Sequence, residues 1–149
     1  MAQHGRRASF GIGVHLMMIK DGRILLLRRS NTGFADGLWQ VPGGGLELGE
    51  SLTACAAREG KEETGALIEE RDLTFAHACQ HRDPDGLDRV GMFFTTGLWD
   101  GTPYNAETHK ASAIDWFLLD RLPAAMVGYG RHAIEQHLAG NTFSQYNFS

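Results

Sequence analysis

Three glutamates, Glu59, Glu62 and Glu63, lie close together in one short stretch of the sequence. At about 100° per residue, a helix would place their carboxylates within a sector of roughly 100° on one side. Like charges so placed repel, particularly near a helix C-terminus, where the macrodipole favours cations. Hard divalent cations would relieve this repulsion, because Mg²⁺ and Mn²⁺ take oxygen ligands and often also bind substrate phosphates. The spacing is therefore compatible with a divalent metal site, and the alternative is a solvated acidic helix end.

The residues before the cluster supply a start for such a helix. A glycine loop beginning at Pro42 leads through Glu50 to Ser51, which is a good N-cap residue, and Gly65 is suited to follow the last turn. A helix is therefore predicted between Ser51 and Gly65, about three and a half turns long. Its small side chains at 54–57 permit close approach to a sheet, which would hold the glutamates at fixed distances. The loop and the helix together favour the metal site over the solvated helix end.

The stretch from Gly44 to Ala66 resembles the Nudix box, the signature of Nudix hydrolases. Five residues separate Gly44 from Glu50, and after seven more comes the run Arg58-Glu59-Gly60-Lys61-Glu62-Glu63-Thr64-Gly65-Ala66. Every charged and glycine position of the 23-residue signature is matched. Gly60 stands where the family normally has a bulky aliphatic residue, and Ala66 is a milder departure. Because glycine costs about 1 kcal/mol relative to alanine within a helix, unusual packing is expected beneath Gly60.

The resemblance implies a set of roles. The metals would be bound by the three glutamates and by the carbonyl of Gly43, and Arg58 and Glu50 would pair to keep the helix and the loop in register. A carboxylate outside the signature often completes the site or acts as the base. Our candidate for that carboxylate is Glu107, and the possible substitutes are Asp85, Asp88 and Glu47, the last of which lies within the signature. The implied reaction is the metal-assisted attack of water on a pyrophosphate linkage.

Residues 28–44 resemble the nucleoside-triphosphate-cleaving MutT type of this family in the spacing from paired arginines to Pro-Gly-Gly. The second arginine contacts phosphate in that branch, so Arg29 is expected to bind phosphate; the alternative is a solvated strand end. Phe34 and Trp39 are expected to stack on a nucleobase, which is worth roughly 1–3 kcal/mol per base. For Trp39, packing in the core is an equal alternative.

A second metal hypothesis comes from His77, Cys79 and His81, which alternation would place on one face of a strand. Histidine and cysteine suit zinc, but structural zinc sites usually have four ligands and no fourth is evident. The alternative is that this face lines the core or the substrate pocket.

The elements that must position these residues follow from apolar runs and turn signals. Strands are predicted on both sides of Asp21-Gly22 as a hairpin, and the turn-rich Asp83-Pro84-Asp85-Gly86 separates two later strands. The predicted strands are 10–20, 23–29, 38–41, 73–81, 90–99 and 113–119, with a second helix at 129–138. This order predicts an α/β (α+β) fold with a mixed sheet between helices. The resemblance implies the same Nudix-like α/β/α sandwich.

Composition limits the other possibilities. The 149 residues, 42% of them hydrophobic, fit a single domain spanning 1–149. A net charge of −4 without a basic patch disfavours a nucleic-acid polymer as partner. The apolar runs are shorter than the roughly 18 residues of a membrane span, and the two cysteines, Cys55 and Cys79, indicate reduced thiols in a cytoplasmic protein. The apolar tail 141–149 is expected to pack on the domain or on a second subunit of a homodimer.

Three functional hypotheses follow. The first is a Mg²⁺-dependent pyrophosphohydrolase, with Mn²⁺ as another usable ion, that converts a nucleoside triphosphate to the monophosphate and pyrophosphate and clears unwanted nucleotides. The second is the same chemistry on another nucleoside diphosphate derivative, such as ADP-ribose, a nucleotide sugar or a dinucleotide. The third is a non-catalytic nucleotide-binding module, against which the complete set of three glutamates argues.

Overall fold

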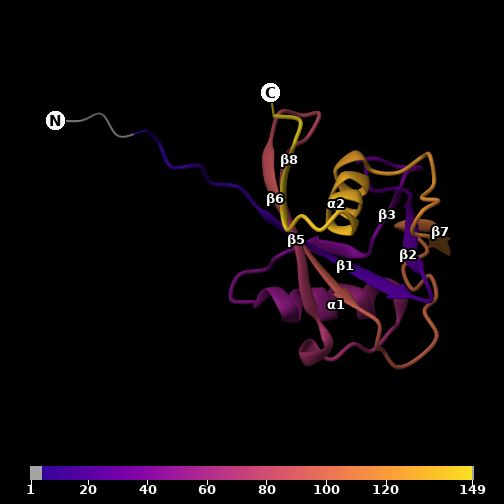
Figure 1. Ribbon diagram of the computed structural model, residues 1–149. Coiled ribbons are helices and arrows are strands. Elements are labelled where there is room, and N and C mark those ends of the chain that lie inside the picture. The colour runs from indigo at the N-terminus through magenta and orange to yellow at the C-terminus, as the bar shows by residue number, and fades with distance from the viewer. Residues whose placement is uncertain (1–4, 149) are drawn as a thin grey trace.

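Two helices lie on opposite sides of a mixed β-sheet (Figure 1). The computed structural model describes residues 5–148. Its elements in chain order are β1 (Ile12–Lys20), β2 (Arg23–Arg29), β3 (Trp39–Gln40), β4 (Gly43–Gly45), α1 (Leu52–Thr64), a 3-10 turn η1 (Glu70–Asp72), β5 (Thr74–Arg82), β6 (Asp88–Thr96), β7 (Ala111–Leu118), α2 (Gly128–Leu138) and β8 (Phe143–Tyr146). The predicted sandwich, a mixed sheet between helices, is confirmed.

Strand β1 joins two halves of the sheet. In one half it pairs antiparallel with β4 and parallel with β6, and β5 and β8 follow. In the other half β2 pairs with β3 and β7. The predicted hairpin exists only at its turn, where Ile19 pairs with Ile24 and Lys20 with Arg23. The two strands then separate, so β1 and β2 carry their side chains into different parts of the molecule.

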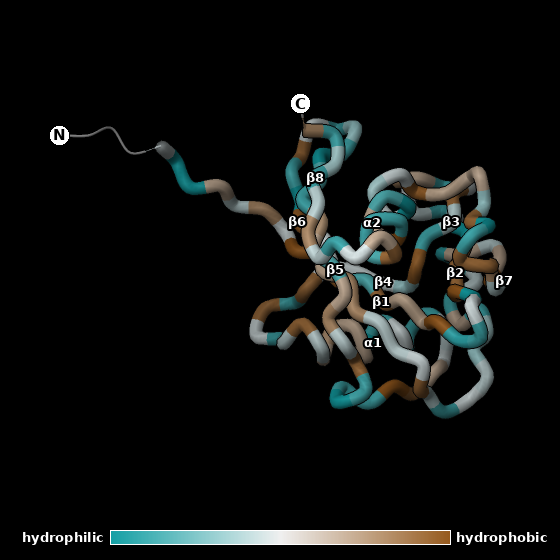
Figure 2. The backbone as a smooth tube through the Cα atoms, viewed as in Figure 1, coloured by the Kyte–Doolittle hydropathy of each residue, from teal (hydrophilic) through white to brown (hydrophobic). Residues whose placement is uncertain are grey.

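Strand β1 is buried on both faces, which explains its continuous apolar sequence. Leu16 and Met18 pack on one side with Ile68, whereas Met17 packs on the other side in the cluster that includes Ala133 and Ile134 of α2. Figure 2 shows this hydrophobic strand running between the two helices. Among the described residues, no helix is both long enough and apolar enough to cross a membrane.

Helix α1 begins and ends where its sequence predicts. The Ser51 hydroxyl accepts a hydrogen bond from the Ala54 N–H at 3.1 Å. At the other end Gly65 has a φ of 73°, and its N–H donates to the Lys61 carbonyl at 2.9 Å. Glycine takes this left-handed conformation without a Cβ clash. Both caps fix the length of α1, and so the positions of the glutamates in its last turns.

Gly60 lies on the buried face of α1, at the position where the signature normally has a bulky side chain. A Cβ atom at this position would lie 2.8 Å from Leu16 Cδ2 and 2.9 Å from Ile68 Cδ1. Leu16 and Ile68 therefore fill the space beneath the helix that a larger residue at 60 would need.

Replacing Gly60 with leucine should lower the free energy of unfolding by about 1–3 kcal/mol, the usual cost of overpacking a core. Equilibrium urea unfolding would measure this change. The double variant Gly60→Leu with Ile68→Ala should recover part of the loss because it removes one of the two obstructing side chains. A Gly60→Leu protein as stable as the wild type would show that this region repacks freely.

Two segments differ from their predictions. Residues Gly43–Gly45 were predicted as part of a loop, which was wrong, because they form strand β4 and pair with residues 13–15 of β1. The apolar tail forms β8, parallel to β5, with Phe143 opposite Ala78. The tail thus packs on its own domain, as one of the two expectations stated, and the homodimer stays a prediction.

Candidate functional site

A cavity of about 860 Å³ is lined by residues from both halves of the sheet, from both helices and from the loops after β2, β5 and β6. The predicted site residues that line it are Arg29, Phe34, Gly43, Glu59, Glu63, Asp85 and Glu107. Its walls also include residues that sequence analysis did not identify, namely His15, Gln40, Lys110 and Tyr129. These four come from separate elements. Gln40 lies within the stretch 28–44 that resembles the MutT type, and the other three belong to no motif that a linear pattern would reveal.

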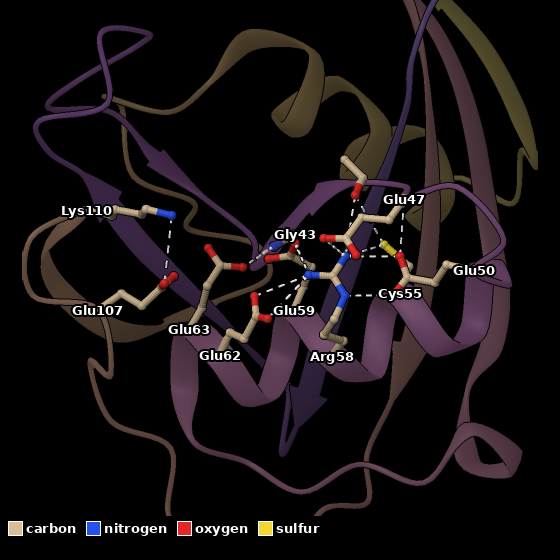
Figure 3. Close-up of polar contacts among 11 residues, drawn as sticks. Gly43, Glu47, Glu50, Cys55, Arg58, Glu59, Glu62, Glu63, Glu107 and Lys110 are labelled. Atoms are coloured by element: carbon tan, nitrogen blue, oxygen red, sulfur yellow. Dashed lines mark hydrogen bonds and ion pairs between the residues drawn. The ribbon is translucent and has the colours of Figure 1, made fainter.

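Strand β4 brings the glycine backbone against the carboxylates of α1. The Gly43 N–H donates to Glu63 Oε2 at 2.7 Å (Figure 3). A Cβ atom at Gly44 would overlap with the carboxylate of Glu59. Glycine at 44 is therefore required for Glu59 to approach the strand this closely, and Glu59 and Glu63 are held at the cavity wall.

Arg58 lies among the acidic side chains and connects the helix to the loop before it (Figure 3). Its Nε donates to Glu50 Oε2 at 2.6 Å, and a terminal nitrogen donates to Glu50 Oε1 at 3.0 Å. Its other terminal nitrogen lies 3.0 Å from Glu59 Oε1 and 3.2 Å from Glu62 Oε2. The two hydrogen bonds from Arg58 lower the pKa of Glu50 to about 2. Arg58 therefore fixes Glu50 in its charged form and orients Glu59 and Glu62.

Glu59 and Glu63 are the electrostatically unfavourable members of the cluster. Burial raises the pKa of Glu59, and the charge of Arg58 offsets part of this. Burial also raises the pKa of Glu63 well above its usual range, and the negative charge of Glu59 raises it further. Buried carboxylates that repel one another gain from added positive charge, so the donor set fits a hard divalent cation.

The carboxylates do not converge on one point in the arrangement described. Within residues 5–148, no three side chains of His, Cys, Asp or Glu lie close enough together to hold an ion. Glu59 and Glu62 turn towards Arg58, and Glu63 turns towards the Gly43 N–H. Binding an ion between them would therefore require Glu62 and Arg58 to adjust, and Glu62 is half exposed and free to do so.

The loop between β6 and β7 brings Glu107 to the same cavity. The loop is attached to the last turn of α1, because the Ala106 N–H donates to the Glu63 carbonyl at 3.1 Å. The charge of Glu107 contributes to the raised pKa of both Glu59 and Glu63. Lys110 Nζ lies 3.8 Å from Glu107 Oε2 (Figure 3). Glu107 is thus a carboxylate from outside the signature that lies beside the acidic face of α1.

The three alternatives to Glu107 have different surroundings. Asp85 lines the cavity, in the turn between β5 and β6. Asp88 forms an ion pair with Arg82 at 2.7 Å, and Glu47 is largely exposed and lies 3.7 Å from Arg58. Among these three, Asp85 is the one that lines the cavity.

Of the three residues expected to contact substrate, two line the cavity and one does not. Arg29 and Phe34 both line the cavity, and the Arg29 guanidinium lies over the Phe34 ring at 5.4 Å. Arg29 Nε also donates to the Phe34 carbonyl at 2.8 Å, which organises the loop after β2. Trp39 instead packs edge-on against Phe117 at 4.8 Å, beside the core and outside the cavity lining. This packing favours the core alternative for Trp39, and its stacking on a nucleobase stays a prediction.

The zinc hypothesis is not supported by the surroundings of its three residues. Both ring nitrogens of His77 have partners, the Asn141 carbonyl at 2.8 Å and the Ser144 hydroxyl at 2.7 Å. Cys79 is buried in the core cluster that includes residues of α2. His81 lines the cavity, and its Nδ1 lies 2.8 Å from Asp83 Oδ1. This face of β5 therefore belongs to the core and to the cavity wall.

Comparison with known proteins identifies the family. The model of the NUDIX domain matches residues 9–137. An ADP-ribose pyrophosphatase of Methanocaldococcus jannaschii is 37% identical over 112 residues, which are 75% of this chain and 64% of that protein. A MutT-like protein of Streptomyces ambofaciens is 46% identical over 116 residues, 71% of this chain and 72% of the relative. The crystal structure of a MutT NUDIX hydrolase from Burkholderia pseudomallei superposes with a TM-score of 0.78 at 31% identity and covers 85% of this chain and 96% of that one. This chain therefore belongs to the NUDIX family of hydrolases.

Proposed function

We propose that this protein is a metal-dependent pyrophosphohydrolase that converts a nucleoside triphosphate to the monophosphate and pyrophosphate, with a role in removing oxidised or non-standard nucleotides. The observation that carries the proposal is the composition of one cavity wall. Glu59, Glu63 and Glu107 lie there together with the cations Arg29 and Lys110. Such a set can hold metal ions and the phosphates that they bind.

Each residue of the site has a separate role in the proposed reaction. A divalent ion, Mg²⁺ or Mn²⁺, held by Glu59, Glu62, Glu63 and the Gly43 carbonyl would neutralise phosphate charge and lower the pKa of a bound water. Arg58 orients the glutamates, and Arg29 and Lys110 bind phosphate oxygens. Glu107 accepts the proton of the attacking water. The water oxygen bonds to phosphorus, the bond from that phosphorus to the bridging oxygen breaks, and pyrophosphate leaves.

A second candidate is hydrolysis of another nucleoside diphosphate derivative, such as ADP-ribose. It is favoured by the 37% identity to a protein named ADP-ribose pyrophosphatase. The triphosphate proposal is supported by the higher identity to a MutT-like protein and by the likeness to a MutT NUDIX hydrolase structure. A module that only binds nucleotide would not need the raised-pKa pair Glu59 and Glu63, which disfavours the non-catalytic alternative.

A substrate panel tests the proposal. The purified chain would be incubated with ordinary and oxidised nucleoside triphosphates, ADP-ribose, nucleotide sugars and dinucleotides, with Mg²⁺, with Mn²⁺ and with a chelator. Pyrophosphate release from triphosphates only when metal is present is the expected result. Cleavage confined to diphosphate-linked compounds would select the second candidate. No metal-dependent turnover on any compound would favour the binding module.

Replacing Arg58 with lysine should lower turnover by about 10–100-fold, the usual cost of disturbing residues that orient metal ligands. Lysine keeps the positive charge but cannot donate two parallel hydrogen bonds to Glu50 while also reaching Glu59. Steady-state kinetics over a titration of Mg²⁺ would measure both turnover and apparent metal affinity. Arg71→Lys is a matched control, because Arg71 pairs with Glu69 at an exposed position. Equal activity of Arg58→Lys and the control would show that Arg58 supplies charge alone.

Replacing Arg29 with alanine should raise KM for triphosphates by about tenfold and change the melting temperature little. A charge-assisted hydrogen bond to phosphate is worth about 1.5–3 kcal/mol, and each 1.4 kcal/mol is a factor of ten in affinity. KM and thermal melting would be measured on the same preparation. The neighbouring Arg28 is the control, since it donates to the Ser112 hydroxyl and does not line the cavity. A fall in melting temperature with unchanged KM would assign Arg29 to the structure of its loop.

We also propose that residues 1–149 form a single domain that works in the cytoplasm. The family match over residues 9–137 supports one domain. The two cysteines, Cys55 and Cys79, are free and buried, which supports a reducing compartment.

A further inference from the structure

One short turn before β7 carries two residues of the cavity lining, Glu107 and Lys110. The Glu107 carbonyl accepts hydrogen bonds from the N–H groups of Lys110 at 2.8 Å and of Ala111 at 3.0 Å. The Lys110 carbonyl in turn accepts one at 2.8 Å from the N–H of Ser30, the residue that follows β2. The Lys110 end of the turn is therefore attached to β2, and the position of its Glu107 end depends on other contacts.

The side chain of Asn105 joins the two ends of this turn. Its Nδ2 donates to the Ala111 carbonyl at 2.8 Å, and its Oδ1 accepts from the Glu107 N–H at 3.3 Å. The two partners fix the orientation of the amide, because a carbonyl only accepts and a backbone N–H only donates. Asn105 is half-buried and lies outside the cavity lining. Any effect of Asn105 on a reaction in the cavity therefore has to pass through the turn.

The two neighbours of Asn105 in the chain are attached to the last turn of α1. The Tyr104 N–H donates to the Thr64 carbonyl at 2.9 Å, and the Ala106 N–H donates to the Glu63 carbonyl at 3.1 Å. Carbonyls at a helix C-terminus have no partner within their own helix, so these hydrogen bonds satisfy groups that need an outside donor. The backbone on both sides of Asn105 is thus fixed to the helix that carries the glutamates.

Glu63 links these attachments to the site. Its carboxylate lines the cavity, and its carbonyl holds Ala106, the residue immediately before Glu107. The Asn105 amide continues this connection from α1 to the turn that carries Glu107. Precise placement matters, because a displacement of about 1 Å at a reacting group can lower a rate about a hundredfold.

We propose that Asn105 is a positioning residue that holds Glu107 in place relative to the carboxylates of α1. This inference rests on the proposed function in taking Glu107 as the base. Loss of the amide would leave the Ala111 carbonyl and the Glu107 N–H without these partners, and the turn could then move against α1. Turnover would fall, whereas substrate binding would change little, because Arg29 belongs to β2 and Lys110 keeps its attachment to the residue after β2.

Steady-state kinetics of Asn105→Leu and Asn105→Ala test the inference, with the compound that the wild type hydrolyses best. Leucine keeps the size of asparagine and loses both hydrogen bonds, and alanine loses the volume as well. In both variants kcat should fall about 10–100-fold, and KM should stay within about threefold of the wild type. Asn141→Leu is the matched control, because Asn141 is exposed and its amide donates to the Gln136 side chain. The control should behave as the wild type.

The double variant Asn105→Leu with Glu107→Gln shows whether Asn105 acts through Glu107. If it does, kcat of the double variant should equal that of Glu107→Gln alone, because the group that Asn105 positions is already lost. A further fall of 10–100-fold in the double variant would overturn the inference. A kcat of Asn105→Leu equal to that of the wild type, while Glu107→Gln lowers kcat, would overturn it too and leave the proposed function standing.

Hydrogen exchange of backbone amides tests the same inference without turnover. In Asn105→Leu the amides of Glu107, Lys110 and Ala111 should exchange at least about tenfold faster than in the wild type, and the amides of α1 should be unchanged. If the wild type hydrolyses no compound, or if Glu107→Gln leaves kcat unchanged, the proposed function or its base fails, and these exchange rates alone decide whether Asn105 holds the turn. Unchanged exchange in the turn would show that it does not.

Discussion

Replacing Glu63 with glutamine should lower metal-dependent turnover by about a thousandfold or more while the protein stays folded. Glutamine has the shape of glutamate, and its oxygen can still accept the hydrogen bond that the Gly43 N–H donates to Glu63 at 2.7 Å. The substitution removes the charge that would hold a cation. Because a bound metal supplies several kcal/mol of transition-state stabilisation and each 1.36 kcal/mol is tenfold in rate, the expected loss is large.

The same variant should keep or raise its melting temperature in the presence of a chelator. Glu63 is a buried carboxylate beside Glu59, so removing its charge relieves repulsion and desolvation. Activity and thermal melting measured together would separate a lost ligand from a lost fold. Glu69→Gln, at an exposed ion pair with Arg71, is the matched control and should behave as the wild type. Near-normal turnover of Glu63→Gln would remove Glu63 from the metal ligands, and Glu62→Gln is open to the same test.

Replacing Glu107 with glutamine should lower kcat by about a hundredfold or more and leave KM nearly unchanged. General base catalysis by a positioned side chain typically contributes about 10²–10⁴-fold. Glu107 and Glu63 both line the cavity. The Lys110 ammonium lies 3.8 Å from Glu107 Oε2, which is longer than a hydrogen bond, so the carboxylate oxygens are available to a water. Steady-state kinetics at saturating Mg²⁺ would measure the change.

The division of the effect between kcat and KM distinguishes a base from a residue that only shapes the loop. Loss of a base should lower kcat alone, whereas loss of a loop contact should also change KM and thermal melting. Asp85→Asn is the informative comparison, because Asp85 is the other candidate base that lines the cavity. A large loss in Asp85→Asn with little change in Glu107→Gln would transfer the role to Asp85.

The sequence by itself determined helix α1 and the order of its charged residues. Ser51 and Gly65 act on neighbouring backbone groups, so their roles as caps do not depend on the rest of the fold. The pairing of Arg58 with Glu50, eight residues apart, was implied by the resemblance to the Nudix box, and the structure contains its two hydrogen bonds. The alternation of apolar and polar runs was also sufficient to predict the mixed sheet between helices. These features have local causes, and local patterns reveal them.

Only the tertiary structure decided what surrounds that helix. The pairing of Gly43–Gly45 with β1, and the docking of the loop that carries Glu107, depend on contacts between segments far apart in the chain. The same holds for Trp39, which packs against Phe117, and for the meeting of His15, Gln40 and Tyr129 in the lining of one cavity. Side-chain types alone do not fix which residues meet, because strand register and the separation of β1 from β2 set the positions of whole segments at once. The acidic helix could therefore be predicted from the sequence, and the cavity that it faces could not.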